Sequence, residues 1–383
     1  MRYRWVVLAA GTFAQSTYAA SFLGPAVLAP ALRARYGLSL TEIGVLLAAS
    51  NLGSIPTLYA WGIATDRWGE RTVIGAGLCA ASACLAAAAF ASSFAALTAL
   101  LFLAGALGAS VNSASGRAVM HWFKASQRGF ALGIRQTAVP IGGAWVALAM
   151  PLFLSAGGVR AGILALAVGC FLGGAIGWVA LREGPEAERE EVQPRVERVL
   201  QDRSLWRLAG ASSLLLAPQS CLVGFLVLFL HEHRGLSTTS AGIVLAALNV
   251  LGIATRIGAG RWSDIARSRV RPLRRIALLS ATLVLCCTAL ISGPIGLLVP
   301  ALVLMGCVTI SWNGLSFAAA AEAAGHARSG TSIGLQQTAL AISGAVFPVA
   351  FGVLVAATSW RAGFAVVALF PLLGWRMLAT VPG

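Results

Sequence analysis

The sequence predicts an all-α integral membrane protein in which twelve transmembrane helices form two pseudo-symmetric six-helix bundles. Three observations predict this fold. The chain of 383 residues is 58% hydrophobic and only 11% charged, which is too apolar for one or two soluble cores. Twelve of its segments approach the roughly 20 mainly apolar residues that a spanning helix needs. Finally, features of the first half recur in the same order in the second half.

The expected spans leave little chain for soluble domains. The first span is too long for the apolar region of a signal peptide and has no clear cleavage site, so we expect it to remain in the mature chain. The twelve expected spans are residues 5–31, 40–63, 72–91, 94–119, 129–154, 159–181, 204–230, 238–260, 275–292, 295–319, 330–357 and 360–380.

Basic residues are distributed unevenly among the loops. If the amino terminus is cytoplasmic, the loops on that side carry 20 Lys and Arg residues and the opposite loops carry 5. This positive-inside pattern predicts that both termini and the middle loop are cytoplasmic. We expect the membrane to be a bacterial inner membrane. The net charge of +15 does not indicate nucleic-acid binding, because the basic residues are divided among short loops without interleaved aromatics.

Two internal alignments establish the repeat. Residues 36–66 match residues 234–264 at an offset of 198, and GIRQT at 133–137 matches GLQQT at 334–338 at an offset of 201. Six spans per half is an even number, so both halves enter the membrane from the same side as parallel repeats. The expected parts are a bundle at 1–181, a solvated cytoplasmic linker at 182–203 and a second bundle at 204–383.

The loop between the second and third spans carries the charged sequence GIATDRWGERT. Together with two six-span halves and a single linker, it resembles the loop motif of the major facilitator superfamily, although Glu70 and Thr72 depart from the pattern. Glycines allow helices to approach, and an Asp can cap a helix or pair with Arg. By resemblance, this loop closes the cytoplasmic side; an ordinary charged turn that sets topology is the alternative. The candidate gating residues are Gly62, Asp66, Arg67, Gly69 and Arg71, with Gly260 and Asp264 in the second half.

Three arginines, Arg117, Arg135 and Arg256, are expected inside spans. An ionisable residue there is costly and is a site candidate by default. At 1.5 Å per residue all three lie roughly 10 Å inside the cytoplasmic face. Since a guanidinium presents a fixed fork of donors that suits carboxylate, nitrate or phosphate, the predicted substrate is a small, organic anion. The resemblance implies that a secondary transporter binds it between the bundles by alternating access.

Each arginine has a second interpretation. Arg256 resembles the span-eight arginine that contacts anions in monocarboxylate, oxalate and nitrate carriers, but it could instead snorkel toward the cytoplasm. Arg117 lies where the superfamily often has a structural arginine, and Arg135 could serve packing. The monocarboxylate carriers place a proton-coupling Asp where this chain has Gly252, so we favour exchange over proton symport.

Uncharged polar residues complete the predicted site. Two repeated asparagine pairs, Asn51 with Asn249 and Asn112 with Asn313, are expected to form interhelical hydrogen bonds. The remaining substrate-binding candidates are Gln15, Tyr18, Gln219, Gln336 and Gln337.

Other functions fit the sequence less well. A multidrug or cation exporter of the same superfamily would need a buried carboxylate, and no Asp or Glu is expected mid-span. A non-transporting sensor would favour a large appended domain. An enzyme is not expected, because the loops show no nucleophile–base pair and no metal-ligand spacing. We therefore expect a monomer with no cofactor or metal, whose partners are the anionic substrate, a coupling ion or counter-substrate and the bilayer.

Overall fold

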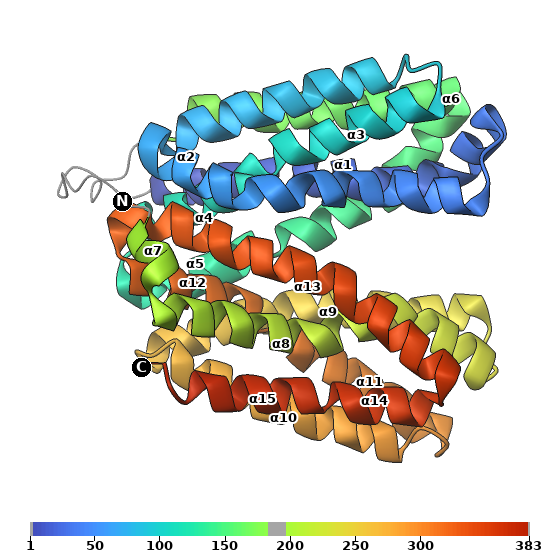
Figure 1. Ribbon diagram of the computed structural model, residues 1–383, viewed down its shortest axis with the longest axis vertical. Helices are drawn as coiled ribbons and strands as arrows, with labels where there is room; N and C mark the ends of the chain where they lie inside the picture. Colours follow the sequence, from blue (N-terminus) through green and yellow to red (C-terminus); the bar gives the residue numbers. More distant parts are fainter. Residues whose placement is uncertain (1–2, 183–196, 382–383) are drawn as a thin grey trace. The chain divides into compact units, whose positions relative to one another are not determined.

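A computed structural model describes residues 3–182 and 197–381, and over these residues the secondary structure is helical. The all-α prediction is therefore confirmed (Figure 1). The elements in chain order are α1 (Tyr3–Tyr36), α2 (Leu40–Ala88), α3 (Phe94–Gly108), α4 (Ser110–Trp122), α5 (Ala125–Arg135), α6 (Ala138–Ala180), α7 (Glu197–Gln201), α8 (Arg203–Leu228), η2 (Phe229–His233), α9 (Thr238–Ile265), α10 (Val270–Ala289), α11 (Ile295–Thr309), α12 (Asn313–Ala324), η3 (His326–Arg328), α13 (Ser329–Ala357), α14 (Trp360–Val367) and α15 (Leu369–Leu378).

Ten helical stretches of the described residues are long and apolar enough to cross a membrane. Two of them, Glu42–Ala88 with 47 residues and Ala125–Ala180 with 56 residues, would each be more than twice as long as the roughly 30 Å hydrocarbon core. The first leaves helical geometry at Gly69 and the second at Gly157 and Gly158. Gly69 and Gly158 adopt φ values of 77° and 65°, which favour glycine. Each stretch supplies two spans, in agreement with the twelve predicted.

The second span of each half begins with a serine cap. The Ser39 hydroxyl accepts from the Glu42 backbone N–H at 3.2 Å, and a Glu42 carboxylate oxygen accepts from the Ser39 backbone N–H at 2.8 Å. Its repeat equivalent Ser237 accepts from the backbone N–H of Ser240 at 3.1 Å. The repeated sequence therefore gives α2 and α9 the same kind of N-cap, a serine whose hydroxyl accepts from a backbone N–H of the first turn.

Contacts divide the chain into two compact units. Unit 1 comprises residues 1–124, 135–199 and 324–338, and unit 2 comprises 125–134, 200–323 and 339–383. A short segment from each half of the sequence therefore packs with the other half. We call 125–134 and 324–338 the exchanged segments; the offset of 201 relates 125–134 to 326–335. Of the predicted linker, residues 183–196 lie outside the described residues.

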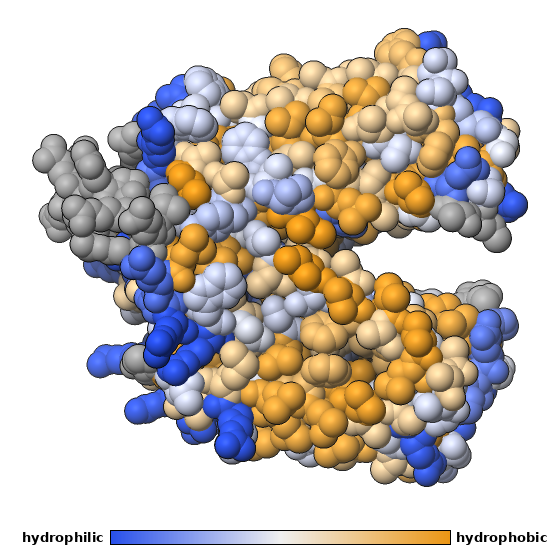
Figure 2. All heavy atoms as spheres, in the orientation of Figure 1, coloured by the Kyte–Doolittle hydropathy of each residue, from blue (hydrophilic) through white to orange (hydrophobic). Residues whose placement is uncertain are grey.

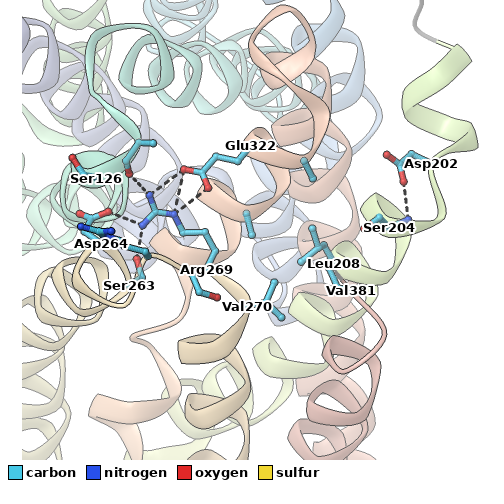
Figure 3. Close-up of a pocket in the computed structure, with 15 residues that line it drawn as sticks. Ser126, Asp202, Ser204, Leu208, Ser263, Asp264, Arg269, Val270, Glu322 and Val381 are labelled. Atoms are coloured by element: carbon cyan, nitrogen blue, oxygen red, sulfur yellow. Dashed lines mark hydrogen bonds and ion pairs between the residues drawn. The ribbon is translucent and has the colours of Figure 1, made fainter. Parts of the chain in front are cut away.

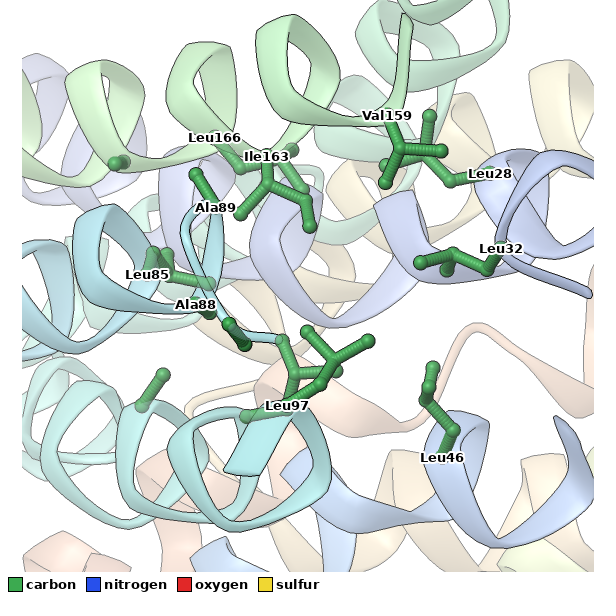
Figure 4. Packing of buried hydrophobic residues seen from close by; sticks show 14 of the residues in the cluster. Leu28, Leu32, Leu46, Leu85, Ala88, Ala89, Leu97, Val159, Ile163 and Leu166 are labelled. Atoms are coloured by element: carbon green, nitrogen blue, oxygen red, sulfur yellow. The ribbon is translucent and has the colours of Figure 1, made fainter. Parts of the chain in front are cut away.

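Each unit has its own apolar core. In unit 1, Leu28 and Leu32 of α1 pack with Leu85 of α2, Leu97 of α3 and Ile163 of α6 (Figure 4). In unit 2, a separate cluster joins side chains of α8, η2, α9, α10, α11, α13 and α14. These cores hold the helices that carry the polar side chains described below.

The outer helix faces are apolar as well. Leu148 is 77% exposed and Val179 is 73% exposed, and apolar side chains cover the flanks of the helices while hydrophilic ones gather at helix ends (Figure 2). Exposed apolar flanks on helices of this length are typical of segments that contact lipid.

Candidate functional site

Arg135 lies at the end of α5 and is fully buried, with 0% exposure. Its Nε donates to the hydroxyl of Ser115 at 2.8 Å, one terminal nitrogen donates to the side-chain oxygen of Gln136 at 3.1 Å, and the other donates to the backbone carbonyl of Asn112. These three acceptors carry no charge of their own. They fix the plane of the guanidinium from α4 and from the turn that follows α5.

Amide side chains extend this network. The Asn112 side-chain oxygen accepts from Gln15 of α1 at 3.2 Å and from Gln337 of α13 at 3.4 Å. The hydroxyl of Ser115 also lies 3.2 Å from the side-chain oxygen of Gln15. Arg135, Gln15 and Gln337, three of the sequence candidates, thus meet in one polar cluster of unit 1, which we call the Arg135 cluster.

Unit 2 contains an equivalent amide pair. The Asn313 side chain donates to Gln219 at 3.2 Å and to the backbone carbonyl of Ile310 at 3.1 Å, as Asn112 bonds to Gln15 and to the carbonyl of Ala109. The predicted interhelical hydrogen bonds of Asn112 and Asn313 are confirmed. Asn249 instead donates to the carbonyl of Leu245 within α9 at 2.9 Å, and an interhelical bond of Asn51 stays a prediction.

Three other candidates have different surroundings. The Nε of Arg256 donates to the carbonyl of Ile310 at 3.1 Å, and Arg256 is partly buried in unit 2. The Tyr18 hydroxyl donates to the carbonyl of Gly105 at 3.2 Å. This hydrogen bond joins α1 to α3. Gln336 is 1% exposed on α13. Substrate binding by these residues stays a prediction.

Arg117 forms ion pairs with the loop motif. Its Nε lies 3.0 Å from Asp66, and one terminal nitrogen lies 2.9 Å from Glu70. The Nδ1 of His121 lies 3.0 Å from the same Glu70 oxygen. The structure thus places Arg117 with the candidate gating residues, which agrees with the structural role that the sequence left open. Glu70, which departs from the family pattern, belongs to the same cluster.

Asp66 and Asp264 bind backbone donors of the exchanged segments. Asp66 accepts from the backbone N–H groups of Gly330 and Thr331 at 2.9 and 2.7 Å. Asp264 accepts from the N–H groups of the equivalent residues, Gly129 and Phe130, at 3.0 and 2.9 Å. Gly330 and Thr331 lie in the first turn of α13, where a carboxylate is a favourable partner for backbone N–H groups. Each unit therefore holds its exchanged segment through one aspartate.

Glycine pairs permit the backbones to approach. A Cβ added at Gly62 would lie 2.6 Å from the carbonyl oxygen of Gly330, and one added at Gly260 would collide with the carbonyl oxygen of Gly129. Gly129 and Gly330 were missed in the sequence. The available signal was a repeated glycine pair four residues apart, at 129 and 133 and again at 330 and 334, a spacing that allows close helix packing.

Arg269 completes the unit 2 site, beside a pocket of about 830 Å³ (Figure 3). It lies 2.6 Å from Asp264 and 3.0 Å from Glu322, and it donates to the hydroxyl of Ser263 at 2.7 Å. Burial lowers the pKa of Arg269, but Glu322 and Asp264 outweigh burial and raise it above its usual value.

The remaining motif residues are less enclosed. Arg67 is exposed, and Arg71 is exposed with its guanidinium carbon 5.0 Å from the ring centroid of Trp178. Among the described residues, no three His, Cys, Asp or Glu side chains gather closely enough to hold a metal ion.

The helices and their exposed apolar flanks define a multi-pass integral membrane protein. A family model of the Major Facilitator Superfamily matches residues 9–348, and the chain belongs to this superfamily of transporters.

Relatives agree with this assignment. The chain is 34% identical to an uncharacterized MFS-type transporter of Mycobacterium tuberculosis over 374 residues, which cover 96% of this chain and 83% of the relative. It is 25% identical to a hexuronate transporter of Bacillus subtilis over 118 residues, which cover 31% of this chain and 28% of the relative. The fold is similar to that of a proton:xylose symporter, with a TM-score of 0.80, 14% identity and coverage of 100% and 96% of the two chains.

Proposed function

We propose that the protein transports a small organic anion by alternating access and that Arg135 is its principal anion-binding group. The observation that carries the proposal is the orientation of a fully buried guanidinium by Ser115, Gln136 and the backbone of Asn112. A carboxylate that approached this cluster would meet a positive charge where electrostatic attraction is far stronger than in water.

The amides of the Arg135 cluster suit the same ligand. Gln15 and Gln337 carry NH₂ donors that now bond to Asn112 and could turn to a carboxylate oxygen. Similarity to a hexuronate transporter over 118 residues points the same way, because a hexuronate carries a carboxylate. Arg256 is the proposed second cationic group, and Gly252 in place of an acidic residue supports exchange rather than proton symport.

The proposed gate consists of Asp66 and Asp264 with the exchanged segments. In alternating access, one six-span bundle, residues 1–181, moves relative to the other, residues 204–383, and the aspartate–backbone bonds break and reform. Arg117 and Arg269 hold the two aspartates in place. The gate lies on the cytoplasmic side of a bacterial inner membrane in this proposal, consistent with the basic loops.

The decisive experiment uses Arg135→Gln, which gives the first half the residue found at its repeat equivalent, Gln336. Purified protein is screened by thermal shift against mono- and dicarboxylates, nitrate and phosphate, and the stabilising anion is tested by counterflow in liposomes. Loss of a charge-assisted hydrogen-bonding group should weaken apparent affinity by about 10- to 100-fold. Arg135→Lys, which keeps the charge but not the fork, should be intermediate.

Arg376→Gln is the matched control, since Arg376 is an exposed arginine at the end of α15, and it should transport normally. Stabilisation by lipophilic cations alone, unaffected by Arg135→Gln and by Arg256→Ala, would refute anion transport and favour a multidrug carrier.

A further inference from the structure

Unit 1 contains an apolar groove of about 550 Å³ between α1 and the two arms of α6 on either side of the Gly157–Gly158 turn. We call it the α6 groove. Small residues leave space in its lining: a Cβ added at Gly169 would have no neighbour within 4 Å. Large side chains also line it, and Trp145, Phe153 and Leu172 are 38%, 39% and 45% exposed. The groove is therefore open at its surface and has bulky apolar walls.

Hydroxyl groups in the lining have their donors in use. Ser16 donates to the carbonyl of Thr12 and Thr17 donates to the carbonyl of Ala14, both at 2.8 Å within α1. A ligand in this groove would meet mainly hydrocarbon and ring surface, which suits an alkyl chain and disfavours a charged or strongly polar group.

The length of the groove matches one leaflet of a bilayer. Its lining residues run from 141 to 153 on the first arm of α6 and from 161 to 172 on the second. At 1.5 Å per residue, both runs cover about the same depth, roughly 5 to 24 Å from the Gly157–Gly158 turn. Half of the roughly 30 Å hydrocarbon core is about 15 Å. An extended chain lying along α6 would thus span about one leaflet.

We propose that the α6 groove binds one acyl chain of a membrane phospholipid, in the leaflet on the side of the Gly157–Gly158 turn. The bilayer is itself apolar, so the preference for this place comes from shape and packing rather than from escape from water. Trp145 and Phe153 supply flat walls, and Gly169 leaves open space in the lining. A chain that fills this space restores dispersion contacts that an empty hollow would lack.

The test places the full-length protein in liposomes that contain a phosphatidylethanolamine with a diazirine on one acyl chain. After illumination, peptide mass spectrometry maps the adducts. We expect adducts within 141–153 and 161–172 to exceed, severalfold, those on exposed apolar helices of unit 2. In Gly169→Leu, whose side chain enters the groove, these adducts should fall severalfold.

Gly224→Leu is the matched control, because Gly224 also lies in an apolar helix with no atom within 4 Å of an added Cβ, and its adduct pattern should not change. If Gly169→Leu fails to fold, Trp145→Ala tests the same proposal by removing a wall, and it should also lower the adducts. Equal labelling of all exposed apolar helices, or labelling unaffected by these variants, would overturn the proposal. So would labelling by a diazirine-bearing free fatty acid but not by the phospholipid.

Discussion

Asp66 in unit 1 and Asp264 in unit 2 occupy equivalent positions of the repeat and bind equivalent backbone. Asp66 accepts from Gly330 and Thr331, and Asp264 accepts from the matching residues of α5. A glycine lies four residues before each aspartate, Gly62 in unit 1 and Gly260 in unit 2, and it leaves room for the exchanged segment. The backbone part of the site is thus built twice in the same way.

The ion pairs around the two aspartates differ. Asp66 pairs with Arg117, which comes from α4 and also binds Glu70. Asp264 pairs with Arg269, which comes from the loop just after α9 and also binds Glu322 of α12. Binding to main-chain N–H groups fixes where the carboxylate must lie, whereas a guanidinium can reach that carboxylate from several elements. One backbone geometry therefore tolerates two different charge networks.

The largest expected effect comes from removing the two arginines. Arg117→Ala leaves Asp66 and Glu70, whose side chains are 1% and 6% exposed, so we expect a loss toward the upper end of the roughly 3 to 5 kcal/mol typical of broken buried pairs. Arg269→Ala leaves Asp264, which is 1% exposed, and Glu322, which is 28% exposed. Because one of these two carboxylates can be solvated, the loss of stability should lie toward the lower end. Thermal unfolding in one detergent measures both.

A second substitution checks the cause. Adding Glu70→Gln to Arg117→Ala removes one stranded charge and should recover part of the lost stability. Equal destabilisation by Arg117→Ala and Arg269→Ala, with no recovery, would mean that the two charge networks contribute alike.

Alanine at the close-contact glycines should have the next largest effect. Gly62→Ala places a methyl group 2.6 Å from the Gly330 carbonyl, so we expect about 1 to 3 kcal/mol of destabilisation and impaired transport. Gly260→Ala should behave similarly, because the backbone contact is repeated. Liposome counterflow and thermal unfolding are the measurements.

The repeat also provides matched controls. Gly44 and Gly242 are equivalent helical glycines with no atom within 4 Å of an added Cβ, and Gly44→Ala and Gly242→Ala should be neutral or slightly stabilising. Damage from these controls equal to that at Gly62 would show that helical glycine in general, rather than close approach, is required.

The smallest expected effect concerns the serine caps. Ser39→Ala and Ser237→Ala should each lower stability by about 1 kcal/mol. Because Ser39 belongs to a reciprocal capping box with Glu42, its loss should also weaken the benefit of Glu42. Combined with Glu42→Gln, Ser39→Ala should therefore show a non-additive change in melting temperature; additive changes would argue against coupling within the box.

Composition, the length of the apolar segments and the internal repeat were enough to predict the spans and the fold class, and a resemblance to the major facilitator superfamily identified the loop motif. Pairing of Asn112 with another helix was also predictable, because a buried amide must find a partner. The exchanged segments were not predictable in this way. An alignment shows which residues are equivalent, as Gly129 and Gly330 are, but it does not show that each packs with the opposite half of the sequence. The Arg117 ion pairs were likewise hidden, because span assignment gives depth and not the direction of a side chain.

The turn at Gln136–Thr137 makes the two exchanged segments mechanically unlike. It separates α5 from α6 directly after Arg135, so segment 125–134 ends at a joint in which backbone torsions can change without bending a helix. Segment 324–338 instead enters α13 at Ser329 and continues in that helix without a break at its end. From Ser329 to Pro348, about 28 Å of continuous helix would transmit a displacement at one end to the other. The two exchanged segments are equivalent in the repeat, but only segment 125–134 is followed by a turn, which lies beside the buried guanidinium of Arg135. Segment 324–338 is followed by continuous helix.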